Sequence, residues 1–80
     1  MGTESLWRER ITIDPAVHHG DPCIARTRVP VSVIVGSIAD GDTFEEIIAS
    51  YPQLTREDIQ AALHYAAEAV NRFDFVPTRK

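Results

Sequence analysis

The apolar residues of this chain recur at helical spacing from Val31 onward, and turn-forming residues divide that pattern into three short pieces. The first piece places apolar side chains at positions i, i+3, i+4 and i+7, which predicts an amphipathic helix that ends at Gly41. A second helix is expected to begin after Thr43, whose side chain caps it, and to end before Pro52. The third and longest is expected to begin after Thr55. Three helices with short connections predict a mainly α fold.

The N-terminal third of the chain shows a different pattern. Residues 10–14 alternate in the way that is typical of a short strand, which Pro15 ends. Residues 15–27 have too little periodicity for a regular element and are expected to form a loop. Residues 27–31 are expected to form a second short strand, in which Pro30 requires a sheet edge or a strand end. The sequence therefore predicts a short β element in front of the helices.

Length and composition favour one small domain. The chain has 80 residues, of which 44% are hydrophobic and 25% are charged, as in a folded globular protein. We expect a single domain over residues 1–80, with a β segment and loop over 10–30, a three-helix helix-turn-helix over 31–72 and a tail over 73–80. A chain of this length buries only about 60% of its unfolded surface, so we expect a homodimer to add stability.

Charge and cysteine content limit the partners and the environment. The net charge of −4 argues against a strongly basic nucleic-acid surface, so any DNA contact needs a local basic patch. The single cysteine, Cys23, excludes an intramolecular disulfide and fits a reducing compartment. No apolar run approaches the roughly 20 residues that a membrane helix needs. We therefore expect a cytoplasmic protein that does not enter a membrane.

The last two predicted helices, joined by a short turn, match a helix-turn-helix. In that arrangement the second helix lies in the major groove of DNA, and its first exposed side chains face the base edges. Arginine pairs with guanine and glutamine with adenine, so this surface is chemically suited to DNA. Solvated polar residues are also the ordinary occupants of such a helix, and the pattern alone leaves both interpretations open. The candidate DNA-reading residues are Thr55, Arg56, Gln60 and His64.

Histidine and cysteine side chains gather in the predicted loop. His18, His19 and Cys23 lie close together in sequence, and His64 is a further candidate to approach them in space. This set raises a zinc site or a cysteine nucleophile activated by histidine, but it matches neither template. A zinc site usually brings paired ligands from two places, and a thiol enzyme needs an orienting third residue. We expect no metal, no cofactor and no enzyme activity, and interpret the cysteine as a buried thiol in a structured loop.

Aromatic residues concentrate at the two ends of the chain. Trp7 precedes the first predicted strand, and Phe73 and Phe75 follow the last helix. One interpretation is that both ends fold back onto the core. The other is that these three side chains form an apolar surface for a second subunit or a different protein partner. The sequence favours neither, and the three aromatics remain candidate partner-binding residues.

Several spaced motifs along the chain together resemble a known family. An ITIDP strand is followed by a GDPCI loop and a TRVPV junction, and then by an EEI helix, a YPQLT turn and an EDIQAALHYA helix. This succession resembles the prokaryotic "domain of unknown function 433" family and covers nearly all of residues 11–70. The resemblance implies a homeodomain-like helix-turn-helix with a short β element in front. It also implies an antitoxin encoded beside a PIN-like ribonuclease toxin, which neutralises that toxin and represses its own operon as a dimer.

The chain departs from the family pattern at two positions in the loop before the first helix. Asp21 stands where the family usually has a basic residue, and Arg26 stands where it usually has glycine. Without glycine, a tight turn with positive φ is disfavoured at residue 26. Arg26 and Arg28 together form a small basic patch that Asp21 weakens, and we expect Arg26 or Arg28 to contact DNA phosphates.

Two functional hypotheses of different classes follow. The first is a homodimeric, antitoxin-like DNA-binding regulator that reads DNA with the third helix and contacts its toxin through the C-terminal tail. The second is a protein-interaction module that binds a toxin or another protein without DNA contact. The acidic net charge favours the second.

Overall fold

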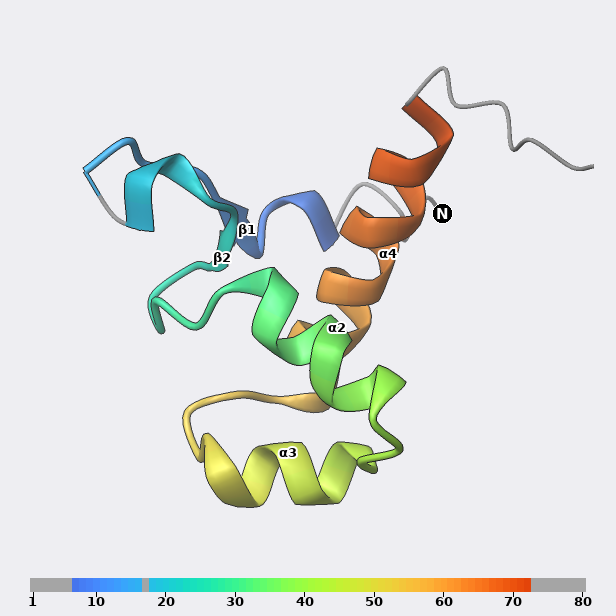
Figure 1. The fold of residues 1–80 in the computed structure, drawn as a ribbon. Helices are drawn as coiled ribbons and strands as arrows, with labels where there is room; N and C mark the ends of the chain where they lie inside the picture. The colour runs from blue at the N-terminus through green and yellow to red at the C-terminus, as the bar shows by residue number, and fades with distance from the viewer. Residues whose placement is uncertain (1–6, 17, 73–80) are drawn as a thin grey trace, which may run out of the picture.

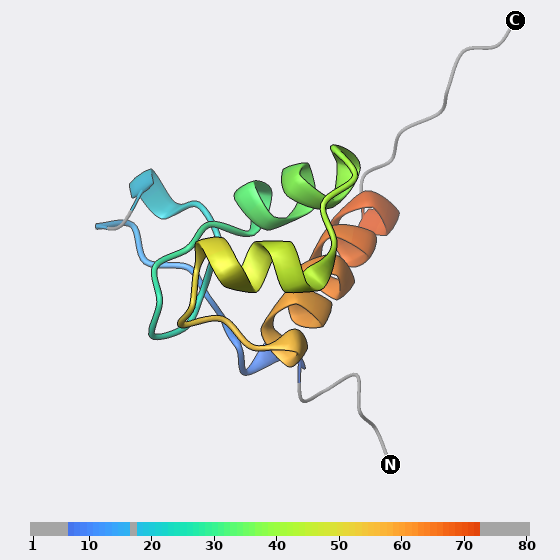
Figure 2. The same ribbon diagram turned by 90° about the horizontal axis from the view of Figure 1, so that it is seen from below.

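The computed structural model of the protein describes residues 7–16 and 18–72 (Figure 1). Within these residues a short antiparallel β element precedes three α-helices, which confirms the predicted mainly α, helix-turn-helix-like fold. α3 lies at the amino end of α4 and runs in a different direction (Figures 1 and 2). The elements in chain order are β1 (Ile11–Thr12), the 3-10 helix η1 (His18–Gly20), β2 (Cys23–Ile24), α2 (Val31–Ala39), α3 (Phe44–Ser50) and α4 (Arg56–Arg72).

Both later helices begin at the threonines that the sequence indicates. Before α3, the Glu46 backbone N–H donates to the Thr43 hydroxyl at 3.1 Å, and the Thr43 N–H donates to the Glu46 carboxylate at 2.8 Å. Before α4, the Asp58 N–H donates to the Thr55 hydroxyl at 3.1 Å, and the Thr55 N–H donates to the Asp58 carboxylate at 3.0 Å. Each pair satisfies backbone donors that the first helical turn leaves without an intrahelical partner.

The end of α2 also lies where the sequence predicts it. Gly41 has a φ of +97°, a conformation that a side chain would strain. Its N–H donates to the Ile38 carbonyl at 2.9 Å, and the Asp42 N–H donates to the Ser37 carbonyl at 3.0 Å. These bonds satisfy carbonyls at the helix end, and the turn allows α3 to leave in a new direction. As a result α2 and α3 both pack on α4.

The hydrophobic core lies between the three helices and β2. Ile24 of β2, Ile34 of α2 and Ile59 of α4 are all fully buried, so the β element is part of the same core as the helices. The buried members of the core are Ile24, Val29, Val31, Ile34, Ile47, Leu54, Ile59 and Ala62. In the part of the chain that the structure describes, no helix is both long and apolar enough to cross a membrane.

The second strand lies earlier than the sequence predicts. β2 pairs with β1 in an antiparallel register that places Ile24 opposite Ile11, and the strand predicted over residues 27–31 is wrong. Of residues 27–31, Pro30 forms an isolated bridge to Cys23. On either side of it the Ile24 N–H donates to the Val29 carbonyl at 2.9 Å, and the Val31 N–H donates to the Pro22 carbonyl at 2.9 Å. A two-residue strand is too short to show an alternating pattern, and β2 lies between a proline and a turn. The sequence pattern therefore did not indicate it. The predicted loop also contains η1, a regular element that the sequence pattern did not indicate.

The turn after β2 keeps a backbone conformation that its sequence disfavours. Arg26 has a φ of 73° and Arg28 a φ of 61°, so the positive-φ turn that the loss of glycine at residue 26 put in doubt is formed. Thr27 holds this turn, because its hydroxyl donates to the Ile24 carbonyl at 3.0 Å and accepts from the Val29 N–H at 3.1 Å. The surrounding hydrogen bonds therefore hold in place a strain of roughly 1 kcal/mol or more at each arginine.

Candidate functional site

The N-terminal segment, residues 7–10, lies along α4 and is attached near the start of that helix by Arg10. The Arg10 guanidinium donates to the Asp58 carboxylate, with 2.9 Å between Nη1 and Oδ1. Asp58 is only 1% exposed, and its second oxygen accepts from the Thr55 N–H. A buried carboxylate needs such donors, and the positive end of the helix dipole stabilises it further. The cap of α4 is therefore also a tertiary contact.

Trp7 and Arg8 attach the other end of the N-terminal segment further along α4. The Trp7 ring is 9% exposed and stacks on His64, with 5.7 Å between ring centroids and 12° between planes. The Arg8 guanidinium lies 4.7 Å from the centre of the Trp7 ring, and its Nη2 lies 2.6 Å from a Glu68 carboxylate oxygen. The Arg8 side chain is half exposed, so this ion pair adds at most about 1 kcal/mol, and Trp7 is the main attachment.

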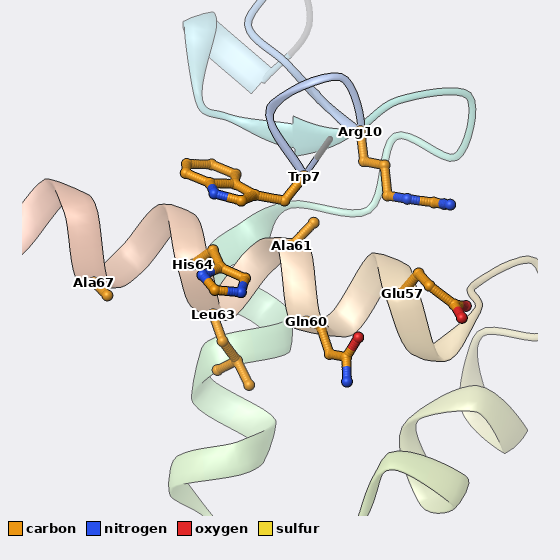
Figure 3. Close-up of a pocket in the computed structure, with 8 residues that line it drawn as sticks. All are labelled: Trp7, Arg10, Glu57, Gln60, Ala61, Leu63, His64 and Ala67. Carbon is orange, nitrogen blue, oxygen red and sulfur yellow. The ribbon is translucent and has the colours of Figure 1, made fainter. Parts of the chain in front are cut away.

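A groove of about 600 Å³ lies where the N-terminal segment meets α4, and we call it the Trp7 groove (Figure 3). Trp7 and Arg10 come from the segment, and every other lining residue comes from α4. Alanine, leucine and tryptophan side chains give the groove apolar walls, and charged and amide groups surround them. This combination is typical of a surface that accepts an apolar anchor from a protein partner. The lining residues are Trp7, Arg10, Glu57, Gln60, Ala61, Leu63, His64 and Ala67.

Two of the predicted DNA-reading residues, Gln60 and His64, lie together in this groove. Gln60 is exposed, and Figure 3 shows its amide directed away from the α4 axis. His64 is also exposed at its edge, but one face of its ring is covered by Trp7. The N-terminal segment therefore occupies part of the α4 surface that a helix-turn-helix would present to DNA.

The other two, Thr55 and Arg56, make contacts at the corner between α3 and α4. The Thr55 hydroxyl accepts from the Asp58 N–H as the helix cap. The Arg56 guanidinium lies 3.1 Å from a Glu45 carboxylate oxygen and 4.8 Å from the centre of the Phe44 ring. Arg56 is exposed, but Glu45 balances its charge. This corner is therefore not a basic patch.

Arg26 and Arg28 lie in the turn after β2, although the sequence placed Arg28 in a strand, and both are exposed. They line a hollow of about 320 Å³ together with Asp14 and Asp21. The charge in this hollow is mixed, in agreement with the weakening that the sequence predicts for Asp21. Whether either arginine contacts phosphate stays a prediction.

Cys23 is buried in β2, and its surroundings keep the thiol protonated. The residue is 1% exposed, and its Sγ lies 3.4 Å from the Asp21 carbonyl oxygen that accepts its hydrogen bond. Burial raises the pKa of Cys23, and the negative charge of Asp21 raises it further. A thiol with a raised pKa is a poor nucleophile. His19 is exposed with a φ of 57°, and among the described residues no cluster of histidine, cysteine and acidic side chains is suited to hold a metal ion.

Of the three aromatic residues that are candidates for partner binding, the structure describes Trp7. Its ring packs on α4 and lines the Trp7 groove, while Phe73 and Phe75 lie outside the described residues. The contacts that hold Trp7 in place were not predicted from the sequence. Arg8 and Glu68 are 60 residues apart, and no local pattern links them. One feature of the sequence did point to Asp58 as a residue with a structural role, because it lies three residues after the capping threonine Thr55.

These features define a small helix-turn-helix-like domain whose last helix is partly covered by the chain's own N-terminal segment. The family model described as "Protein of unknown function (DUF433)" matches residues 11–66, and the chain belongs to this family. The matched residues begin just after the N-terminal segment, so Trp7 and Arg10 lie outside them.

The chain is also similar to a curated protein and to a solved structure. The chain is 37% identical over 59 residues to "Uncharacterized protein y4eO" of Sinorhizobium fredii, a match that covers 74% of this chain and 27% of that relative. The chain thus spans about a quarter of that protein's length. It is also similar to the crystal structure of a DUF433 member from Anabaena variabilis, with a TM-score of 0.74 and 35% identity. That match covers 86% of this chain and 68% of the other.

Proposed function

We propose that this chain is a protein-interaction module of antitoxin type, which binds a partner protein in the Trp7 groove. The observation that carries the proposal is the position of Trp7, which lies on the α4 surface that a helix-turn-helix uses for DNA. A buried tryptophan with apolar neighbours and an exposed polar rim is the usual centre of a protein interface. The partner implied by the family resemblance is a PIN-like ribonuclease toxin.

The charges around α4 favour a protein partner over DNA. Arg56 is balanced by Glu45, and Glu57 is exposed in the first turn of α4. Phosphate contacts by lysine and arginine supply most of the affinity of DNA-binding proteins, and the net charge of −4 opposes them. A protein partner needs no such excess of positive charge.

DNA reading remains a second candidate because of the arrangement of α3 and α4. They are separate helices joined by a short turn, with exposed Thr55, Arg56 and Gln60 at the start of the second. Such a pair is the framework of a DNA-reading domain. A promoter-bound form would require Thr55, Arg56 and Gln60 to supply the base contacts without His64, since His64 is stacked on Trp7.

Blocking the groove with a large side chain tests the proposal. Ala67 is exposed and lines the Trp7 groove, so Ala67→Arg should fill it while leaving the core intact. Ala49 is exposed on α3 outside the groove, and Ala49→Arg is the matched control. The chain is co-expressed with a PIN-like ribonuclease toxin, the class of partner that the family resemblance implies, and toxicity and co-elution are measured. We expect wild type and Ala49→Arg to neutralise the nuclease and Ala67→Arg to fail. If both variants neutralise the nuclease equally well, the Trp7 groove is not the binding surface.

A gel shift separates this proposal from DNA reading. A fragment of the protein's own promoter is titrated with the chain at low salt, where phosphate contacts are strongest. The interaction-module proposal expects no shift. A shift that Arg56→Ala abolishes, and that weakens steeply as salt rises, would instead establish α4 as a DNA-reading helix.

A further inference from the structure

The formal charges of residues 7–10 and 56–68, which together form the Trp7 groove, are not evenly matched. Every arginine in these two ranges has a carboxylate partner, and the pairs are Arg8 with Glu68, Arg10 with Asp58 and Arg56 with Glu45. Glu9 and Glu57 are exposed, and neither has an ion-pair partner among the described residues. The formal charges that remain unmatched in these two ranges are therefore negative.

One of these two carboxylates, that of Glu57, lies at one end of the Trp7 groove. Figure 3 shows Glu57 on the same side as Arg10, and Ala67 at the opposite end of the part of α4 that lines the groove. Ten helical residues separate Glu57 from Ala67, a distance of about 15 Å. Trp7 and Ala61 line the part between them. The groove thus has an acidic end and an apolar end.

The length of the groove sets the size of what can contact both ends. An extended chain spans at most about 3.3 to 3.6 Å per residue, so about 15 Å requires four or five residues. A single side chain cannot reach from Glu57 to Ala67. A peptide segment of a protein can.

Arg10 also lines the groove, but its charge is needed by Asp58. The Arg10 side chain is 35% exposed, whereas the Asp58 side chain that it bonds to is 1% exposed. An acidic ligand that drew Arg10 away would leave a buried carboxylate without its cation, which is strongly unfavourable. A basic ligand beside Glu57 breaks no existing ion pair. The charges of the groove therefore favour a cation.

We propose that the partner segment in the Trp7 groove is basic, with an apolar side chain against Trp7 and Ala67 and a lysine or arginine beside Glu57. This inference rests on the proposed function and names the chemistry of its partner. The apolar contacts give most of the affinity, because buried anchors dominate interface energies. Glu57 gives specificity, because a charge at the rim of an interface attracts its opposite and repels acidic segments.

Selection from a library of random linear peptides tests this chemistry. The folded wild-type chain is immobilised, and the peptides that bind it are sequenced. A parallel selection uses Glu57→Lys, an exposed change whose effect on the helices is checked by circular dichroism. We expect the wild-type chain to enrich peptides that combine lysine or arginine with an apolar residue. Glu57→Lys should lose this preference and enrich acidic peptides.

A neutral substitution in the groove separates failure of this inference from failure of the proposed function. Ala67→Gln fills part of the groove without changing the net charge, and Ala49→Gln on α3 is its control. Peptides that bind in the groove should bind Ala67→Gln more weakly than Ala49→Gln. Groove-dependent peptides with no preference for lysine or arginine would overturn the basic partner and leave the proposed function in place. Equal binding to both variants would overturn the groove as a binding surface, and both proposals with it.

Titration of one selected peptide measures the effect of Glu57. Trp7 is the only tryptophan and lines the groove, so its fluorescence reports the binding of a peptide that lacks tryptophan. We expect Glu57→Lys to bind at least about tenfold more weakly than wild type. Asp42→Lys makes the same change in charge at an exposed position outside the groove, and should bind within about twofold of wild type. An equal loss in both variants would show that net charge governs binding, and would overturn the role of Glu57.

Salt dependence tests the ion pair itself. Affinity for the wild-type chain should fall as salt rises, because salt screens exposed charges. Glu57→Gln should bind more weakly than wild type at low salt and depend less on salt. The same salt dependence in both chains would mean that no cation of the peptide lies beside Glu57.

Discussion

The two capping threonines, Thr43 and Thr55, share one local motif and differ in what surrounds it. At Thr43 the partner carboxylate is Glu46, an exposed side chain bonded within its own turn. At Thr55 the partner is Asp58, which is buried and also bonded to Arg10, 48 residues away. One cap begins a helix, and the other also attaches the N-terminal segment. The comparison teaches that the same sequence signal can set local structure alone or local and tertiary structure together.

The largest expected effect is the difference between removing the two capping carboxylates. Asp58→Ala removes a buried charge and leaves Arg10 without its partner, and should lower the free energy of unfolding by about 3 kcal/mol. Glu46→Ala removes one exposed hydrogen bond and should cost about 0.5 to 1 kcal/mol. Urea unfolding followed by far-UV circular dichroism measures both. Equal losses would mean that the bond to Arg10 adds nothing to the cap.

A smaller effect is expected when the attachment is cut from the other side. Arg10→Ala leaves Asp58 with its backbone partner, and should cost about 2 kcal/mol, since Arg10 is one-third exposed and water replaces part of its contact. Trp7 is the only tryptophan, so its fluorescence reports on the N-terminal segment. In the variant we expect the fluorescence change to precede the loss of helix in urea, while both coincide in wild type.

Arg8→Ala is the control for the separation of the fluorescence and circular dichroism transitions that we expect in Arg10→Ala. Its ion pair with Glu68 is largely solvated, so the loss should stay below about 1 kcal/mol. If fluorescence and circular dichroism still change together in Arg10→Ala, the segment is held by Trp7 packing alone.

The sequence predicted what local chemistry decides and missed what distant contacts decide. The helix starts at Thr43 and Thr55 and the turn at Gly41 were all correct, because each depends on residues within one or two turns. β2 was missed because Cys23 and Ile24 are extended through pairing with β1, not through a pattern of their own. Residue spacing alone could not reveal such a pairing.

The candidate site shows the same division. Sequence reasoning chose Gln60 and His64 on α4, and both line the Trp7 groove. It did not predict that Trp7 would cover part of that surface, because the contact joins the two ends of the sequence. It also proposed Arg56 for DNA reading, and could not predict its ion pair with Glu45 on the preceding helix. These contacts become visible only once the helices are placed in space.

A smaller effect is expected in the turn after β2, where tertiary structure imposes a backbone conformation that the local sequence disfavours. Arg26 has positive φ, so Arg26→Gly should relieve strain and raise the free energy of unfolding by about 0.5 to 1 kcal/mol, after the greater freedom of glycine in the unfolded chain is subtracted. Ala25→Gly, at a neighbour without positive φ, should instead cost about 0.5 to 1 kcal/mol. Thermal unfolding of both variants measures the contrast. Destabilisation by both would mean that the Arg26 side chain makes contacts that outweigh its backbone strain.

The smallest expected effect concerns the second buried ionisable group of the N-terminal region, Cys23. It is buried in its neutral form, because burial and the charge of Asp21 raise the pKa of the thiol. As pH rises above the ordinary thiol pKa of about 8.5, the unfolded chain loses this proton while the folded chain keeps it. The folded state then binds more protons than the unfolded state, so stability falls with pH until the folded thiol also ionises.

Cys23→Ala removes this proton and is the control for the pH dependence. The wild-type chain should lose stability more steeply than the variant between pH 8 and pH 10, roughly the range above the ordinary thiol pKa. The variant should be less stable at neutral pH, since Cys23 is buried and the smaller alanine leaves a cavity. If the free energy of unfolding falls with pH at the same rate in wild type and variant, the thiol ionises equally in the folded and unfolded states. Cys23 would then be more accessible to solvent than its 1% exposed fraction implies.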